Sequence, residues 1–410
     1  MWALTYQYSR SAATLCKQAD SSSCSEMFMH ESAVGQESTP GLSYFVDVFD
    51  RVDLFDRIDN QTVVRLSCLG QKSGFASVES VQKSTGIAVR RMLKSGVQSV
   101  DVATAVFDKL CRVSAYAPAD FSVVLLCHSG VDDECGAQLA SAVERHYQLS
   151  PQTVRPYNFG CSGFLKLLQE GTLLLADRRN IKRIALLNVE TPETWHDGSD
   201  RLFCGIVSAG ATGVVLERNL GMPISVIRAD DFAISPSLRP NPDPLFRKET
   251  GPVYTFRGDT ISRTVMRMNA ETVFLNGIEL MLNNLRSAVA SIDLQPGQRV
   301  IVIPHQPSGK LLKALIAAAR LEYPSFEFLN NLNNFGNTIS AAVPTIMARL
   351  PQVIEQNGGQ PIRHGDLIIL LAAGICMHEI ANHMSAGHAC LEWVSAETSV
   401  ARIESVAMMR

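Results

Sequence analysis

The sequence predicts an α/β protein that consists of two similar halves. Short apolar runs, typical of strands buried on both faces of a sheet, alternate with longer segments whose apolar residues have helical spacing. At 410 residues the chain also exceeds the length that one hydrophobic core normally supports. The alternation begins near residue 61 and is repeated in the second half of the chain, which indicates two halves with helices covering their sheets.

The first half is expected to contain four buried strands, with an amphipathic helix between the first two. The strands are predicted at 62–70, 121–129, 181–190 and 212–218, and the helix at 100–112. The first 60 residues are polar and irregular, and their serine-rich stretch "QADSSSCSEM" is typical of a segment outside a core. We therefore predict an N-terminal extension over 1–60 and a first half over 61–228.

The second half is predicted over 250–410 and has the same style. Its helices are expected at 271–292, 310–321 and 337–350, and its strands at 299–305 and 366–374. The motif "PGQ" follows the first of these helices, and a proline lies near the end of the first strand. Both interrupt the apolar pattern where an element should end.

The composition indicates a large core and no preference for a charged partner. Hydrophobic residues make up 46% and charged residues 19%, and the net charge is -3. This balance gives no electrostatic footprint for nucleic acid or an anionic membrane, and no apolar run reaches the ~18 residues that span a bilayer. The ten cysteines include no CxxC pair, and the N-terminus lacks the features of a secretory signal. We therefore expect a reduced, cytoplasmic protein.

A cysteine between two glycines lies where a strand-like stretch gives way to a helix-like one, in "YNFGCSGFLKLL" (157–168). At a helix N-terminus, Cys161 would meet unpaired N–H groups and the positive end of the helix dipole, which lower a thiol pKa. Gly160 allows a sharp turn, and Gly163 allows close approach of another group. Cys161 is thus a candidate nucleophile, although a buried structural cysteine would fit the stretch as well.

Two more polar residues lie at element boundaries in the second half. His305 follows the strand 299–305 at its end, where α/β folds usually carry their sites. Asn337 begins a predicted helix, and alone it would be interpreted as a helix cap. Together with Cys161, however, they suggest a thiolate served by two polar donors.

Three motifs in this order, "GCSGFLKLL", "PHQPSGKLL" and "GNTISAAVP", closely resemble the active-site motifs of the β-ketoacyl-acyl carrier protein synthase III group of the thiolase superfamily. The segments "KSTGIAVRRM" (83–92) and "MNAETVFLNGI" (268–278) are similar to further family segments. The resemblance runs from about 62 to 393. It implies a thiolase-like five-layered αβαβα fold made of two duplicated halves, usually assembled as a homodimer.

The resemblance also implies the chemistry. Cys161 would take an acyl group from a CoA or acyl carrier protein thioester, and His305 and Asn337 would donate hydrogen bonds to the carbonyl of a malonyl-type extender. Decarboxylation would then leave an enolate that attacks the acyl-cysteine, because two neutral donors stabilise the developing charge. Backbone N–H groups of Cys161 and Gly374 would bind the second oxyanion. The expected substrates are CoA or phosphopantetheine thioesters, with no cofactor and no metal.

The sequence departs from the family pattern at several places. Ser308 replaces an asparagine expected to contact the pantetheine arm, and "SAGATG" (208–213) replaces a glycine-rich segment that carries an acid. The C-terminal glycine-rich loop is interrupted by an insertion near 375–385. Together with the N-terminal extension, these departures favour a specialised enzyme of fatty-acid-like or polyketide secondary metabolism.

Two other features are candidates for binding roles. Arg90 and Arg91 are positioned to meet the phosphates of CoA or an acidic carrier protein, or else to form surface salt bridges. The stretch "HEIANH" (378–383) is similar to a zinc-protease motif, but its histidines are five residues apart. On a helix they would point about 140° apart and could not share a metal.

Three alternatives to a condensing enzyme remain. An acyltransferase of the same fold would move the acyl group to oxygen or nitrogen, but it would need a base more than the second neutral donor, Asn337. A plant-type polyketide synthase would be expected to carry "HPGG" and "GFGPG", which are absent. A non-catalytic subunit of a heteromeric synthase would not need the complete set of cysteine, histidine and asparagine.

Overall fold

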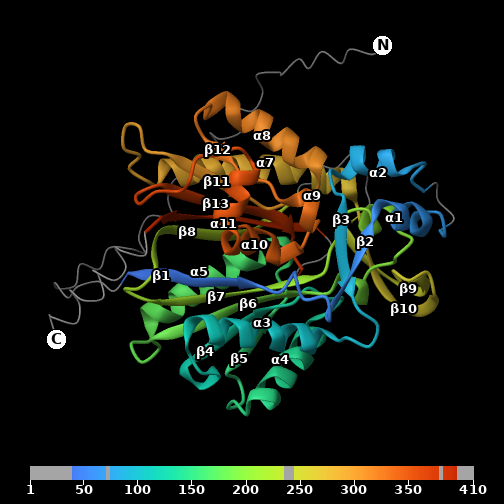
Figure 1. Ribbon diagram of the computed structural model, residues 1–410, viewed down its shortest axis with the longest axis horizontal. Coiled ribbons are helices and arrows are strands. Elements are labelled where there is room, and N and C mark those ends of the chain that lie inside the picture. The colour runs from blue at the N-terminus through green and yellow to red at the C-terminus, as the bar shows by residue number, and fades with distance from the viewer. Residues whose placement is uncertain (1–38, 71–73, 235–243, 378–381, 395–410) are drawn as a thin grey trace. The chain divides into compact units, whose positions relative to one another are not determined.

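Two five-stranded sheets with the same strand order meet edge to edge in the computed structural model, which describes residues 39–70, 74–234, 244–377 and 382–394 (Figure 1). The first sheet contains β1 (Pro40–Asp47), β4 (Val123–Cys127), β5 (Val154–Tyr157), β6 (Arg183–Glu190) and β7 (Gly210–Arg218). The second contains β8 (Met222–Ala233), β11 (Val300–Pro304), β12 (Glu327–Phe328), β13 (Leu367–Ile375) and β14 (His383–Glu392).

The two sheets are duplicates in order and direction. The order β5-β4-β6-β7-β1 in the first corresponds to β12-β11-β13-β14-β8 in the second. In both sheets the first three strands of these orders are parallel, and the last two pairings are antiparallel. The sheets meet where β1 and β8 pair over only two residues each. This correspondence confirms the prediction of two duplicated halves.

Helices form three layers around these sheets (Figure 1). On the first sheet, the outer layer is α3 (Ser99–Ser114) and α4 (Asp133–Tyr147). On the second, it is α7 (Ala270–Ala290), with α8 (Gly309–Glu322) beside it. Between the sheets, α5 (Gly163–Asp177) and α10 (Ala342–Ala348) contact strands of both halves. The result is the predicted αβαβα arrangement.

Burial on both faces explains the continuous apolar runs. Along β4, Leu125 and Cys127 pack toward the central helices, whereas Val124 and Leu126 pack toward the outer ones. Successive side chains of a strand point to opposite faces, so a strand covered on both sides must be apolar throughout. Helix α5 is apolar nearly all round for the same reason, since it lies between two sheets.

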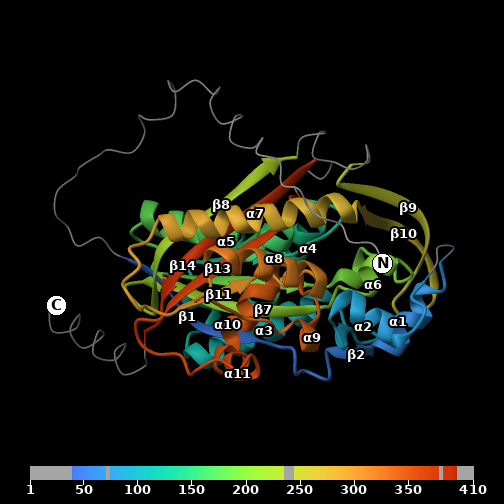
Figure 2. The ribbon, with the colours of Figure 1, turned by 90° about the horizontal axis from the view of Figure 1, so that it is seen from above.

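Smaller elements gather at one end of the sheets (Figure 2). Two hairpins pair β2 (Phe55–Asp59) with β3 (Val89–Leu93) and β9 (Phe246–Tyr254) with β10 (Thr260–Met268). Near these hairpins lie the short helices α1 (Asn60–Ser67), α2 (Val78–Thr85), α6 (Arg201–Cys204) and α9 (Leu332–Phe335), whereas α11 (Leu350–Gln356) lies beside α10. None of the described helices is long and apolar enough to cross a membrane.

Two predictions about the start of the chain are wrong. The segment 62–70, predicted as a strand, lies largely in helix α1, which Asp59 caps by accepting a hydrogen bond from the Thr62 N–H at 2.8 Å. Residues 40–59, predicted to lie outside the core, form β1 within the first sheet and β2 in a hairpin. Residues 1–38 lie outside the described residues.

The boundary between the halves also differs from the prediction. The first half was predicted to end at 228 and the second to begin at 250, whereas strand β8, which begins at Met222, already belongs to the second sheet. The remaining predicted strands, 121–129, 181–190, 212–218, 299–305 and 366–374, are confirmed to within two residues at each end. The helices predicted at 100–112, 271–292 and 310–321 are confirmed as α3, α7 and α8 to within the same margin.

Candidate active site

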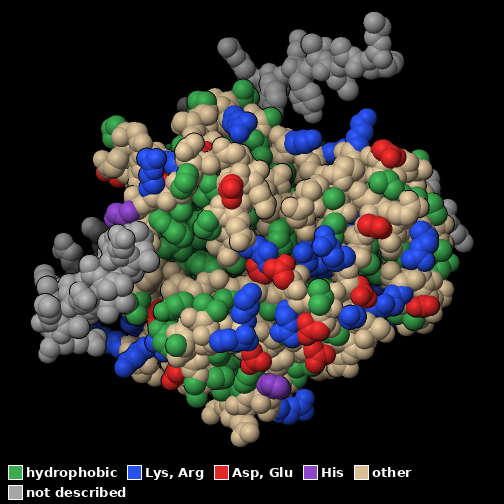
Figure 3. Space-filling model, viewed as in Figure 1, with side chains coloured by type: hydrophobic (Ala, Val, Ile, Leu, Met, Phe, Trp, Pro, Cys, Tyr) green, Lys and Arg blue, Asp and Glu red, His purple; other side chains and the backbone are tan. Residues whose placement is uncertain are grey.

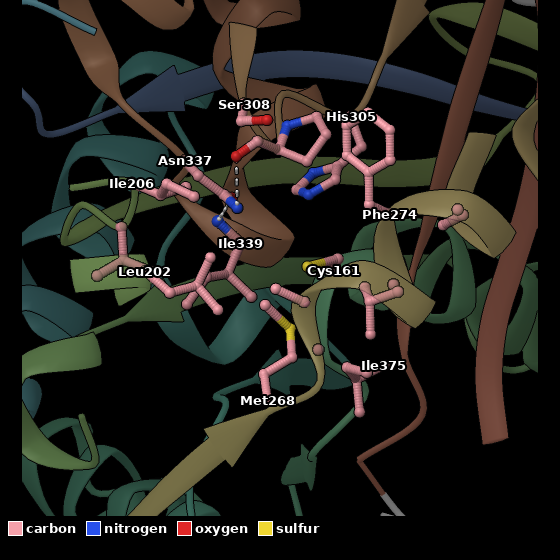
Figure 4. Close-up of a pocket in the computed structure, with 18 of the residues that line it drawn as sticks. Cys161, Leu202, Ile206, Met268, Phe274, His305, Ser308, Asn337, Ile339 and Ile375 are labelled. Atoms are coloured by element: carbon pink, nitrogen blue, oxygen red, sulfur yellow. Dashed lines mark hydrogen bonds between the residues drawn. The ribbon is translucent and has the colours of Figure 1, made fainter. Parts of the chain in front are cut away.

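A pocket with a cavity volume of about 180 Å³ opens beside Cys161 and is lined by residues of both halves (Figure 4). Its walls are mostly apolar side chains from α6, β10 and α7, among them Leu202, Met268 and Phe274. Polar side chains gather at one end, where Cys161, His305 and Asn337 point toward one another from three different segments. A thioester could therefore place its polar carbonyl at this end and its apolar chain against the walls.

Glycines fix the position of Cys161. It lies in a single 3-10 turn, Gly160–Ser162, directly before helix α5. Gly160 has a φ of 61°, a left-handed conformation that favours glycine, and a Cβ there would lie 2.8 Å from the carbonyl oxygen of Ile375. A Cβ at Gly163 would lie 2.4 Å from the sulfur of Cys127. The turn can therefore fit between its neighbours only with glycine on both sides of Cys161.

The pKa of Cys161 is raised, whereas the sequence predicted that it would be lowered. Burial and the nearby Glu190 carboxylate raise the pKa of the Cys161 thiol to about 12. A low-polarity environment disfavours the charged thiolate, and a neighbouring negative charge disfavours it further. The prediction of a lowered pKa is therefore wrong for this structure, and Cys161 rests as a thiol that must lose its proton during reaction.

His305 is a neutral, unpartnered donor at the end of β11. Its side chain is only 1% exposed, and neither ring nitrogen has a hydrogen-bond partner among the described residues. Burial lowers the pKa of His305 to about 3, so the imidazole is uncharged at neutral pH. A neutral imidazole carries one N–H donor and one acceptor nitrogen. In Figure 4 its ring lies beside Cys161, where either could serve a substrate carbonyl or the thiol proton.

Asn337 lines the pocket, and its side chain also makes local hydrogen bonds that fix its orientation. Its Oδ1 accepts a hydrogen bond from the Ile339 N–H at 2.9 Å, and its Nδ2 donates to the Pro307 carbonyl at 3.4 Å. An amide nitrogen has two N–H donors, so one is left to face the pocket. The helix predicted at 337–350 begins later than expected, since a 3-10 turn, Ile339–Ala341, precedes α10.

Gly374 and Ser308 also line this pocket. Gly374 of β13 lies so close to Cys161 that a Cβ at this position would be 2.4 Å from the cysteine Cβ. Ser308 caps helix α8, and its hydroxyl accepts a hydrogen bond from the Leu311 N–H at 3.4 Å. Five of the seven site residues predicted from the sequence thus lie around one cavity.

The two predicted arginines are not part of the site. Arg90 and Arg91 lie on β3 with side chains 0% and 7% exposed. Arg90 donates to the Gly205 carbonyl, and Arg91 donates to the Phe49 carbonyl at 2.8 Å. Burial lowers the pKa of each to about 10. The prediction that they meet the phosphates of CoA or a carrier protein is wrong, because their guanidinium groups hold neighbouring segments together instead.

The histidine-rich segment does not form a helix where the structure describes it. His378 lies outside the described residues, whereas His383 and His388 lie on strand β14. His388 Nδ1 makes a hydrogen bond of 2.9 Å with Asn284 Oδ1. Among the described residues, no group of three potential metal ligands occurs. The segment 375–385, predicted as an insertion, includes the last residue of β13 and the first three residues of β14, and its residues 378–381 are outside the described part.

One buried acid near the site was missed by the sequence analysis. Glu190 ends strand β6, is 0% exposed, and lies close enough to raise the pKa of Cys161. Burial raises the pKa of Glu190 itself to about 8. The signal in the sequence was an acidic residue at the end of the apolar run "IKRIALLNVE", where an exposed side chain would have been the simplest interpretation.

Several known proteins are similar to the chain in sequence. Residues 289–379 match the family model described as 3-Oxoacyl-(acyl-carrier-protein) synthase III C terminal. The β-ketoacyl-(acyl-carrier-protein) synthase III of Synechocystis sp. is 24% identical over 304 residues, 73% of this chain and 86% of that protein. The corresponding protein of Porphyra purpurea is 24% identical over 296 residues, 72% of this chain and 86% of that protein.

Solved structures agree with the fold. The 3-oxoacyl-(acyl carrier protein) synthase III of Pseudomonas aeruginosa has a TM-score of 0.64 at 18% identity, covering 87% of this chain and 99% of that one. The priming β-ketosynthase of a polyketide biosynthetic pathway has a TM-score of 0.66 at 16% identity, covering 88% of this chain and 98% of that one. The chain therefore has the duplicated thiolase-like fold, and it is similar in sequence and in structure to β-ketoacyl-acyl carrier protein synthase III proteins.

Proposed function

We propose that the chain is a condensing enzyme that loads an acyl group onto Cys161 and joins it to a malonyl-type thioester by decarboxylative Claisen condensation. The observation that carries the proposal is the convergence of Cys161, neutral His305 and Asn337 at the polar end of an apolar pocket. Both expected donors are uncharged, and neutral N–H donors aimed at the developing oxyanion can stabilise an enolate.

In the first half-reaction, the Cys161 sulfur attacks the carbonyl carbon of an acyl thioester. As the bond forms, the free ring nitrogen of His305 relays the thiol proton to the leaving sulfur of CoA or the carrier protein, so that no imidazolium accumulates. The backbone N–H of Cys161 and the Gly374 edge of β13 flank the sulfur where the tetrahedral oxyanion would form. The acyl chain then lies against the apolar walls.

In the second half-reaction, the extender carbonyl accepts hydrogen bonds from His305 and Asn337. Carbon dioxide leaves, and the electron pair of the broken bond moves onto the oxygen that the two donors stabilise. The enolate carbon attacks the acyl carbonyl, a carbon–carbon bond forms, and the Cys161 sulfur leaves as a thiolate. This thiolate takes up one proton from solvent and returns to the resting thiol. The apolar walls exclude water, which would otherwise weaken these hydrogen bonds and hydrolyse the acyl-cysteine.

The expected partners follow from this chemistry. Acyl-CoA or acyl carrier protein would supply the acyl group, the reaction needs neither metal nor redox cofactor, and a cytoplasmic homodimer is the expected setting. On the face shown in Figure 3, basic and acidic side chains of the described residues are interspersed. The charge of this face therefore favours neither acyl-CoA nor acyl carrier protein as the acyl donor. The relatives named for polyketide priming support a place in fatty-acid-like or polyketide synthesis.

Incubation of the purified protein with a panel of acyl-CoA primers and malonyl thioesters tests the proposal. We expect an acyl adduct on Cys161 by peptide mass spectrometry, followed by release of carbon dioxide and a β-ketoacyl product. The Cys161→Ala variant should show no adduct at this peptide. Acylation without carbon dioxide release would support transfer to oxygen or nitrogen instead, and the absence of an adduct would support a non-catalytic subunit.

A further inference from the structure

Glu190 is a buried acid whose hydrogen-bond partners, among the described residues, are neutral donors from two other segments. The Ser129 hydroxyl, just beyond β4, donates to its Oε1 at 3.0 Å, and the Ser129 N–H donates to its Oε2 at 3.3 Å. The Ser340 hydroxyl also donates to Oε1, as does the Ser340 N–H at 3.4 Å. A carboxylate is costly to bury without a cation, so its retention at 0% exposure calls for a role.

Ser340 connects this carboxylate to both reacting groups. It lies in the 3-10 turn Ile339–Ala341, three residues after Asn337, and the same turn supplies the N–H that fixes the Asn337 side chain. On its other side it contacts the start of α5, because a Cβ at Gly163 would lie 2.8 Å from the Ser340 Cβ. The turn that carries Asn337 is therefore held between Glu190 and the helix that follows Cys161.

We propose that Glu190 is a positioning residue for decarboxylation, which holds Ser340, and through it the Asn337 amide, in register with Cys161. The inference rests on the proposed condensing function. This role explains why an acid lies at the end of an apolar strand, because one carboxylate can accept all four hydrogen bonds from two serines. Acyl loading does not use the Asn337 amide, so it should depend on Glu190 much less.

The two half-reactions separate this role from a general loss of structure. In Glu190→Gln we expect malonyl decarboxylation to fall about tenfold to a hundredfold, since small displacements of a donor have effects of this size. Loading of Cys161 should slow by no more than about twofold, because the nucleophile and its turn stay in place. Ser340→Ala should show the same pattern, and the double variant should lose little more, because both changes remove one shared link.

Ser129→Ala is the matched control. It removes a hydrogen bond from the same carboxylate but leaves the link to Ser340, so decarboxylation should stay within about twofold of the unmodified protein. A parallel fall of both half-reactions in Glu190→Gln, or an equal loss of decarboxylation in Ser129→Ala, would overturn the inference.

A crystal structure of Glu190→Gln gives a readout that does not depend on activity. We expect the Asn337 amide to be displaced from its hydrogen bond with the Ile339 N–H, and an unchanged Asn337 would count against the inference. If the unmodified protein neither loads an acyl group nor releases carbon dioxide, the proposed function fails, while this structural result still decides the role of Glu190.

Discussion

Gly374 passes so close to Cys161 that a methyl group on its Cα would lie 2.9 Å from the cysteine sulfur. Any side chain at this position would occupy the space in which an acyl group forms its bond to that sulfur. The reacting site therefore requires a glycine at 374. The other residues of the same strand, β13, are buried in the core.

We predict that Gly374→Ala blocks acylation of Cys161. The added methyl group would overlap the cysteine, so we expect the rate of adduct formation from acyl-CoA to fall at least about a hundredfold. The measurement is mass spectrometry of the Cys161 peptide over time. Gly251→Ala is the control, because a Cβ at Gly251 of β9 would meet nothing within 4 Å. Equal loading in the two variants would contradict the geometry.

His305 should act as a neutral donor over the whole physiological pH range. Because burial lowers the pKa of His305 to about 3, its N–H stays uncharged between pH 5 and pH 8. We expect His305→Ala to lower the rate of malonyl decarboxylation by about 100-fold to 1,000-fold. His305→Gln, which restores a neutral N–H, should recover part of this loss. A decarboxylation rate that follows a titration near pH 6.5 would show instead that the imidazole is protonated in use.

The sequence could predict the repeated pattern of buried strands and the three reactive residues that occur in a fixed order. Apolar runs identified β4, β6, β11 and β13, because strands covered on both faces have no polar position. Cys161, His305 and Asn337 were identified because each begins or ends an element. Helix α1 was misjudged because four apolar residues in nine fit either structure when the segment is short.

Properties that depend on three-dimensional neighbours could not be predicted. From the sequence alone, Arg90 and Arg91 would be expected to be exposed. Only the packing of β3 shows that their guanidinium groups donate hydrogen bonds to backbone carbonyls. The dipole argument for a lowered pKa of Cys161 considered one helix, whereas the pKa is set by burial and by Glu190 from another strand. Strand β1 was overlooked because it lies within the first 60 residues, whose polar and irregular composition is typical of a segment outside a core.

The reactivity of Cys161 should rise with pH and with removal of Glu190. Since its thiol pKa is raised to about 12, we expect the rate of alkylation by iodoacetamide to keep rising from pH 7 to pH 10 without a plateau. Because burial raises the pKa of Glu190 to about 8, Glu190→Gln removes a negative charge mainly above pH 8, where it should lower the thiol pKa and increase the rate. Peptide mass spectrometry can follow Cys161 beside the exposed Cys68, whose rate should not respond to the substitution. A plateau near pH 8 would contradict the raised pKa.

Glu190 should also make the folded protein less stable as the pH rises. Burial raises its pKa from 4.5 to about 8, so the folded state holds this proton more tightly than the unfolded state. Its stabilising contribution is complete below pH 4.5 and is lost as the pH rises to about 8. The difference in the free energy of unfolding between Glu190→Gln and the unmodified protein should therefore shift in favour of the variant over this range. A difference that does not change with pH would show that Glu190 ionises normally.

The ion pair between Arg349 and Asp47 should contribute strongly to stability because it joins the halves from within. Arg349, directly after α10, donates to both oxygens of Asp47 at the end of β1, each at 2.6 Å, and the two side chains are 18% and 4% exposed. Arg349→Ala would leave a buried carboxylate without its cation, at a cost of about 3 kcal/mol in the free energy of unfolding.

Urea denaturation measures this loss, and Arg51→Ala is the matched control. Arg51 pairs with Asp53 on the surface, where the side chains are 47% and 59% exposed. Solvent screens an exposed pair and both partners stay hydrated after its removal, so we expect no measurable change in the urea midpoint of this control. Equal losses in the two variants would mean that burial between β1 and α10 does not strengthen the pair, and that the two halves are held together by their shared apolar layer alone.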